Sequence, residues 1–220
     1  RTFMDDVNVF PFGTEAECWV NLREQIEKRK NDKLYFWAYW GAYDHLAHVY
    51  GPDDERARLF FMNFNHSLEQ DFLMRLSPEL RKGTLLVLTA DHGQIRIDPD
   101  PVFDLVNHPE FLNCLHIKPT GEGRLTYLHL KPGKEETLRE YASAAWPDQF
   151  VIKGSSELLD AGFFGPGTPM QDIHNRLGDL TMIAKGKSYL WWSDEENPLK
   201  GRHGGLTPDE MLVPLAAVRL

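Results

Sequence analysis

Five side chains in three short stretches of the chain have the types and spacing of a metal site. Asp44 and His48 are four residues apart, so one helical turn would place both on the same face. Asp91 and His92 stand together before a glycine, and His203 lies in a glycine-rich loop. Each stretch taken singly also fits an ordinary polar loop or a tight turn.

Together, these side chains offer two carboxylates and three imidazoles. This mixture of oxygen and nitrogen donors suits zinc, and also manganese or iron, whereas calcium and magnesium prefer oxygen donors alone. A single catalytic zinc usually takes three ligands from the protein. Five donors therefore predict two metal ions, with at least one further ligand outside this set.

The five side chains follow segments that have the pattern of buried strands. Residues 33–40 and 84–89 are apolar almost throughout, as in strands that are covered on both faces of a parallel sheet. Amphipathic periodicity predicts helices over residues 15–29 and 53–76. Alternation of helix and strand predicts an α/β fold, in which three layers (α/β/α) surround a mostly parallel sheet. Ligands bind beyond the carboxyl ends of such strands, where these motifs fall.

After residue 98 the run DPDP breaks the pattern, and shorter elements follow. The predicted strands are 125–130, 150–153, 180–184, 189–192 and 211–218, and the predicted helices are 135–145 and 155–161. The glycines at 165, 167 and 178, with Arg176 and Asp179, could form a substrate-facing loop, but we interpret them as turns and caps. We predict a metal-binding core of residues 1–100 and 203–220, and a smaller inserted α+β subdomain, a cap, of residues 101–202.

Composition excludes some classes of protein. The 220 residues include 24 Lys and Arg against 33 Asp and Glu, a formal charge of −9, whereas nucleic-acid-binding domains are typically basic. The longest apolar stretch, residues 34–43, is about half of the roughly 20 residues that a membrane helix needs. We therefore expect neither binding of a nucleic-acid duplex nor a membrane span in this chain. The sequence indicates neither the oligomeric state nor the localisation of the protein.

Three motifs resemble those of the alkaline phosphatase superfamily, most closely its type I phosphodiesterase and nucleotide pyrophosphatase branch. They are DHLAHVYGP at 44–52, TADHG at 89–93 and HGGLTPDEMLVPL at 203–215. Their order, contexts and spacing all agree with this branch. The segment between residues 98 and 201 is similar only loosely, through LDAGFFGPG at 159–167 and NRLGDL at 175–180.

The resemblance implies two zinc ions at the carboxyl edge of a parallel sheet, and hydrolysis of phosphate esters through a covalent phospho-enzyme or nucleotidyl-enzyme intermediate. By position, Asp44, His48 and His203 would hold the metal that activates the attacking water. Asp91 and His92 would hold the metal that activates the nucleophile. The implied substrate is a small phosphate ester, and a net acidic protein needs cations to receive it.

The sequence departs from the family in its nucleophile. Family members carry, upstream of these motifs, an aspartate that ends the first strand and a Thr or Ser at the start of the next helix. Before Asp44 the only candidates are Asp5, Asp6 and Thr14, and Thr14 has the position of a helix N-cap. We therefore expect the chain to correspond to the C-terminal half of such an enzyme, with the nucleophile upstream of Arg1. This part alone should be inactive.

Other classes share some of these features. Cofactor-independent phosphoglycerate mutases also use Asp-x3-His and ADHG motifs with two metals, although VYGP and HGGLTPDEMLVPL favour the phosphodiesterase branch. Sulfatases need Cys-x-Pro-x-Arg, and neither Cys18 nor Cys114 is followed by Pro and Arg at those places. A third alternative is a non-catalytic metal-binding module of the same fold. We favour it for the chain alone, but not for a longer parent protein, because all five ligands are intact.

Overall fold

The computed structural model describes residues 7–220, which have a mixed α/β fold. The described residues fall into two compact units. Unit 1 comprises residues up to 46 together with 54–89 and 214–220, and unit 2 comprises residues 47–53 and 90–213. Each unit has an apolar core of its own. In the described part of the chain, no helix combines the length and the apolar character that crossing a membrane requires.

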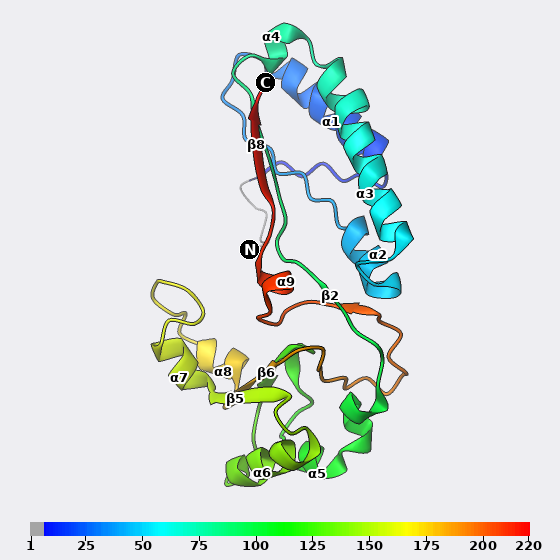
Figure 1. Cartoon of the computed structure of the whole chain (residues 1–220). Helices are drawn as coiled ribbons and strands as arrows, with labels where there is room; N and C mark the ends of the chain where they lie inside the picture. Colours follow the sequence, from blue (N-terminus) through cyan, green and yellow to red (C-terminus); the bar gives the residue numbers. More distant parts are fainter. Residues whose placement is uncertain (1–6) are drawn as a thin grey trace. The chain divides into compact units, whose positions relative to one another are not determined.

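Unit 1 is built on two packed helices. Helix α1 (Glu15–Lys28) begins at Thr14, whose hydroxyl accepts from the backbone N–H of Glu17 while the Glu17 carboxylate accepts from Thr14 in return, a capping box. Helix α3 (Glu55–Ser67) continues through η1 (Leu68–Phe72) and η2 (Leu73–Arg75), and the short helix α4 (Pro78–Arg81) follows after two extended residues. Figure 1 shows α1 and α3 side by side. Their shared core contains Cys18, Trp19, Phe64, Phe72 and Leu76. The two predicted helices are therefore confirmed.

The strands of unit 1 differ from the prediction. Strand β1 (Leu85–Thr89) pairs antiparallel with β8 (Leu215–Arg219), and these strands lie side by side in Figure 1. They are not covered on both faces, since Leu85 is 66% exposed and Leu215 is 77% exposed. Residues 33–40 have no regular structure and expose Tyr35 and Trp37. The prediction of a buried strand at 33–40 is wrong for the described structure, because an extended segment becomes a strand only beside a neighbour that accepts its hydrogen bonds.

The sheets of the described residues are small, and their strands pair antiparallel, so the predicted three-layer parallel sheet is not found among them. The sheet of unit 2 has the order β3 (Thr120–Glu122), β4 (Leu125–Leu128), β6 (Leu180–Ala184) and β5 (Phe150–Gly154). Helix α6 (Glu135–Ala145) packs on it through Leu138 and Ala142. The predicted strand at 189–192 reduces to one bridge between Trp191 and Asp104.

Short elements complete unit 2. The remaining helices are η3 (Pro101–Phe103), η4 (Leu105–Asn107), α5 (Pro109–Asn113), α7 (Ser155–Asp160), α8 (Ile173–Leu177) and α9 (Pro208–Met211). Strands β2 (Ile95–Arg96) and β7 (Gly201–Arg202) form a two-stranded sheet. This pairing matters for function, because β2 follows the Asp91 and His92 motif and β7 leads directly into His203. The sheet therefore brings the two histidine loops together from distant parts of the sequence.

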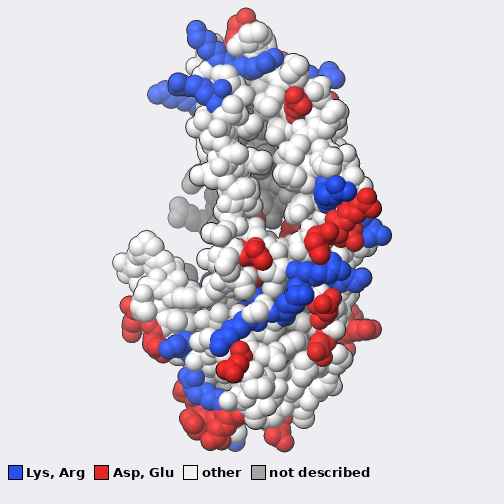
Figure 2. All heavy atoms as spheres, viewed as in Figure 1, with Lys and Arg blue, Asp and Glu red and all other residues white. Residues whose placement is uncertain are grey.

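The charged side chains are mixed in sign on the face that Figure 2 shows. Figure 2 shows Lys and Arg in a diagonal band across this face, with Asp and Glu on both sides of it. Several charges pair directly, as in Lys118 with Asp194 at 3.0 Å and Lys187 with Asp98 at 3.8 Å. Such exposed pairs contribute little to stability.

Candidate metal centre

Helix α2 (Ala42–Tyr50) positions two of the predicted ligands. Asp44 is in its first turn and His48 in its last, four residues later on the same face. The helix ends at Tyr50, and the next residue, Gly51, has a φ of +96° and donates its N–H to the Ala47 carbonyl (2.9 Å), the turn that a glycine favours. The four-residue spacing of the two ligands therefore places both on one face because the segment is a regular helix.

The His48 ring is held by the backbone of β7. Its Nδ1 is 2.8 Å from the carbonyl oxygen of Gly201, and the backbone N–H of Lys200 donates to the His48 carbonyl at 2.8 Å. Assigned from this contact, Nδ1 carries the proton and Nε2 presents its lone pair. A Cβ at Gly201 would lie 2.2 Å from the Ala47 carbonyl oxygen, so only glycine lets β7 approach so closely. Metal-binding histidines commonly have this kind of second contact.

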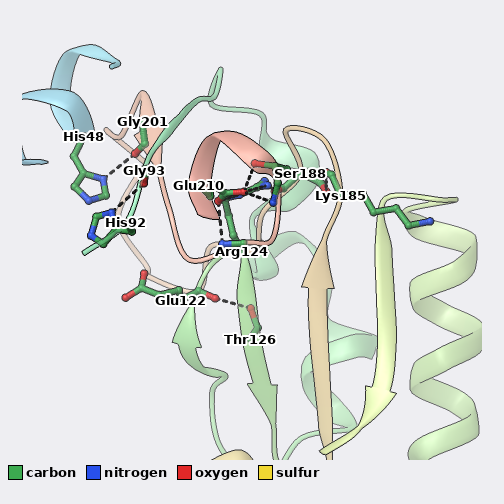
Figure 3. Close-up of polar contacts among 12 residues, drawn as sticks. His48, His92, Gly93, Glu122, Arg124, Thr126, Lys185, Ser188, Gly201 and Glu210 are labelled. Carbon is green, nitrogen blue, oxygen red and sulfur yellow. Dashed lines mark hydrogen bonds and ion pairs between the residues drawn. The ribbon is translucent and has the colours of Figure 1, made fainter. Parts of the chain in front are cut away.

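The two other histidines adjoin His48. The His203 ring centroid is 5.0 Å from that of His48 and 3.7 Å from that of His92, with the latter pair stacked at 16°. The Nδ1 of His92 is 2.9 Å from the carbonyl oxygen of Gly93, which again leaves Nε2 as the outward nitrogen (Figure 3). Three imidazoles that are far apart in the sequence therefore form one cluster.

Asp44, His48 and His203 are the described group whose ligand atoms converge as a metal site requires. One atom from each lies within 4.8 Å of the others. One carboxylate and two imidazoles match the three protein ligands of a catalytic zinc that keeps an open position.

Asp91 and His92 form a second, smaller pair. The Asp91 carboxylate oxygen is 3.8 Å from Nε2 of His92, and the Asp91 side chain is 60% exposed. They are not part of the converging group, although His92 adjoins it through the stack with His203. Two donors from the described residues are fewer than a zinc ion usually takes.

The other candidates from the sequence have structural roles or fall outside the description. Thr14 is the N-cap of α1, as predicted, and Asp5 and Asp6 lie outside the described residues. Gly165 and Gly178 have φ of 97° and 63°, which turns require. The Asp179 carboxylate accepts from the backbone N–H of Leu130.

Sequence reasoning missed a buried ion pair beside the centre. The side chains of Arg124 and Glu210 are 0% and 1% exposed. The pattern Thr207-x-x-Glu210 is that of a capping box, and the structure forms it at the start of α9. That signal was available for Glu210. No sequence pattern singles out Arg124, because its partner lies 86 positions further along the chain.

The type I phosphodiesterase / nucleotide pyrophosphatase family model matches residues 8–206, so the chain belongs to this family. Murine and human ectonucleotide pyrophosphatase / phosphodiesterase 5 have similar folds. Their TM-scores are 0.70 and 0.67 at 17% identity, over 94% of this chain and 54% of theirs. Phosphonoacetate hydrolase from Sinorhizobium meliloti has a TM-score of 0.52 at 22% identity, over 79% and 43%.

At these identities the solved structures show similarity of fold alone. No curated protein matches the chain in sequence. The chain spans about half the length of the murine and human proteins, since it covers 54% of each. The family expected from the three motifs is confirmed by the family model.

Proposed function

We propose that the chain is the C-terminal part of a two-metal hydrolase of phosphodiesters or nucleotide pyrophosphates. The observation that carries this proposal is the convergence of Asp44, His48 and His203 in a member of this family. Carboxylate and imidazole donors at this spacing suit zinc, and they also suit manganese or iron. When bound, the metals supply positive charge for the attacking and leaving oxygens of an in-line displacement at phosphorus.

The residues of the chain have separate tasks in this proposal. His48 presents Nε2 because Gly201 accepts the proton on Nδ1, and His92 does the same through Gly93. Asp44, His48 and His203 would hold the first metal, and Asp91 and His92 would contribute to the second. A substrate phosphate approaching a protein with a formal charge of −9 needs those cations to offset repulsion.

The proposed substrate is a small phosphate ester, with nucleotides foremost. An inactive variant of the murine relative, in which a threonine is replaced by alanine, was solved in complex with AMP. That description supports a threonine nucleophile and a nucleotide ligand for the present protein too. The proposed reaction then proceeds through a covalent nucleotidyl-enzyme or phospho-enzyme intermediate on a Thr or Ser.

We assign that nucleophile, and further ligands for the second metal, to a longer protein. The chain spans about half the length of its structural relatives. Strands β1 and β8 and residues 34–37 also expose large apolar side chains, which a longer protein would cover by adding further strands, with β8 as an antiparallel member of a mostly parallel sheet. The antiparallel sheet and helices of residues 101–202 would form its inserted cap, with 1–100 and 203–220 in the core.

The test is zinc-dependent hydrolysis of a chromogenic phosphodiester by the longer protein and by the 220-residue chain. We expect the longer protein to be faster by orders of magnitude, and its activity to be lost in His203→Ala. Equal rates would place the nucleophile within this chain, or show that none is used. No hydrolysis by the longer protein with zinc bound would refute the proposed reaction.

A second candidate is a metal-binding module without turnover, which the exposure of Asp91 favours for the chain alone. Elemental analysis of the dialysed chain measures how many metal ions it holds, and the hydrolysis assay on the longer protein separates the two candidates. We expect one tightly held zinc ion per chain, because Asp91 and His92 offer only two donors. Two tightly held ions would contradict this ligand count.

A mutase like those that share the ADHG motif would instead move phosphate between hydroxyls of one substrate without net hydrolysis.

A further inference from the structure

Arg124 and Glu210 form a fully buried ion pair in unit 2. Arg124 precedes β4 and donates from Nη2 to one Glu210 oxygen at 2.8 Å and from Nε to the other. Its Nη1 donates to the carbonyl oxygen of Ser188. Figure 3 shows the guanidinium facing the carboxylate at the centre of this network. The paired geometry fixes the Glu210 side chain as well as neutralising it.

The Glu210 carboxylate also holds the loop of His203. It accepts from the backbone N–H of Gly205 at 2.9 Å and from the hydroxyl of Thr207 at 2.7 Å. Gly205 is two residues after His203. A Cβ at Gly205 would lie 2.7 Å from the Glu210 carboxylate and 2.9 Å from Arg124 Nε, so the loop packs directly on the pair.

The backbone of the same residue holds the loop of His92. The carbonyl oxygen of Glu210 accepts from the backbone N–H of Gly93, the residue after His92, at 2.8 Å. A Cβ at Gly93 would lie 2.0 Å from the carbonyl oxygen of Asp209, so this loop can approach only with glycine. Glu210 therefore anchors both histidine loops, one through its side chain and one through its backbone.

Stabilisation of the fold does not by itself explain why this ion pair is buried. Burial raises the pKa of Glu210, but hydrogen bonds from Arg124, Thr207 and Gly205 outweigh this effect and hold the pKa below its ordinary value. The pair is thus ionised, and removing two charges from water costs about as much as their attraction returns. Apolar side chains of similar size often stabilise a core equally well.

We infer that Arg124 and Glu210 are positioning residues, which set the spacing of His92 and His203 and thereby the metal affinity of the centre. This inference rests on the proposed metal-binding function and deepens it. Arg124 lies in the turn between β3 and β4, so the sheet of residues 120–184 would take part in metal binding without supplying a ligand. Residues that orient metal ligands typically contribute 10-fold to 100-fold in affinity.

The test compares three forms of the chain: wild type, the double variant Arg124→Leu with Glu210→Met, and Leu138→Ala. The double variant removes both charges and keeps the interior apolar, but it also leaves the Gly205 N–H without its acceptor, so its urea midpoint should fall no further than that of Leu138→Ala. Its zinc dissociation constant, measured by competition with a chromogenic chelator, should rise about 10-fold or more. In the metal-free double variant, the nuclear Overhauser effect between the stacked rings of His92 and His203, which metal-free wild type should show, should be absent.

Leu138→Ala is the matched control, because Leu138 is fully buried in the core of unit 2 and its apolar side chain makes none of the hydrogen bonds of the pair. It should lower the urea midpoint, leave the zinc dissociation constant within about twofold and keep the ring contact. Wild-type affinity and ring contact in the double variant would overturn the inference. So would an equal loss of affinity in both variants. Absence of zinc binding by wild type would overturn the proposed function, and the inference with it.

Discussion

His48 and His203 should each be necessary for tight zinc binding. The His48 ring is oriented by the Gly201 carbonyl, and the His203 ring lies 5.0 Å from it. We predict that His48→Ala or His203→Ala weakens zinc binding about 100-fold or more. Loss of a residue that only orients a ligand lowers metal affinity by up to about 100-fold, and loss of the ligand itself should lower it at least as much. Isothermal titration of the chain measures this effect.

His66→Ala is the control for that titration, since His66 is exposed in the last turn of α3 and its ring is not part of the cluster. Its zinc affinity should equal that of wild type. If His66→Ala weakened binding as much as His203→Ala, zinc would be held by surface histidines in general, and the centre would lose its support.

At the residue scale, the sequence predicted the donors but not what orients them. Asp44 and His48 could be placed on one face because helical spacing is local. Motif order suggested that His203 joins them, and the structure brings their atoms within 4.8 Å. The contacts of Arg124 with Glu210 and Ser188 bridge 86 and 64 positions, and no local pattern encodes such distances.

At the scale of elements, Thr14 tests the start of α1. Thr14→Ala should destabilise unit 1 by about 1 kcal/mol, because it removes the side-chain acceptor for the backbone N–H of Glu17. Thr14→Ser keeps the hydroxyl and should retain most of that stability. Urea unfolding followed by circular dichroism measures both. In the longer protein neither change should reduce phosphodiester hydrolysis, and a loss in Thr14→Ala alone would instead identify Thr14 as a nucleophile.

The start of α9 should govern part of the acid sensitivity of unit 2. The folded pKa of Glu210 is lowered because hydrogen bonds outweigh the opposing effect of burial. Its stabilising contribution is therefore complete above the unfolded pKa, about 4.3, and is lost as the pH falls through the folded value. At pH 7, Glu210→Gln should cost about 3–5 kcal/mol, since it leaves Arg124 buried without a counter-charge.

Below pH 4 the difference between wild type and Glu210→Gln should narrow, because only the wild type has that carboxylate to protonate. Urea unfolding at pH 7, 5 and 3.5 measures the difference. A gap that stays constant over this range would mean that the pKa of Glu210 is the same in the folded and the unfolded chain, and a gap that widens as the pH falls would mean that folding raises this pKa. Glu135→Gln, at an exposed pair with Arg139, is the control and should change stability little.

Elements with a periodic pattern were predictable, and those that need a neighbour were not. Helix α6 has the predicted bounds, 135–145, because its apolar spacing and length suffice. Strands β4, β5 and β6 were also found, at 125–128, 150–154 and 180–184. Residues 33–40 have the composition of a strand, but the described chain offers them no partner strand. Composition alone cannot say which strand lies alongside.

At the scale of the whole molecule, the exposed apolar strands should matter for solubility. Leu215 on β8 is 77% exposed. We predict that Leu215→Lys raises the solubility of the 220-residue chain and leaves its urea midpoint unchanged, because the side chain already contacts solvent. In the longer protein the same change should be destabilising, since the proposed sheet would bury this position. Light scattering and urea unfolding measure the two effects.

Arg219→Glu is the control, because it changes the charge on the same strand without replacing an apolar side chain. It should not reproduce the gain in solubility. If Leu215→Lys is equally harmless in both lengths of the protein, β8 is exposed in the longer protein as well. The proposal that further chain covers this strand would then be wrong.

The two separate cores have a consequence for thermodynamic measurements on this chain. One core is centred on Trp19 and Phe64, the other on Trp146 and Tyr189, and they have no residue in common. Unfolding of the described chain should therefore not be all-or-none. The van't Hoff enthalpy from one spectroscopic probe should fall below the calorimetric enthalpy, and zinc should shift one transition more than the other.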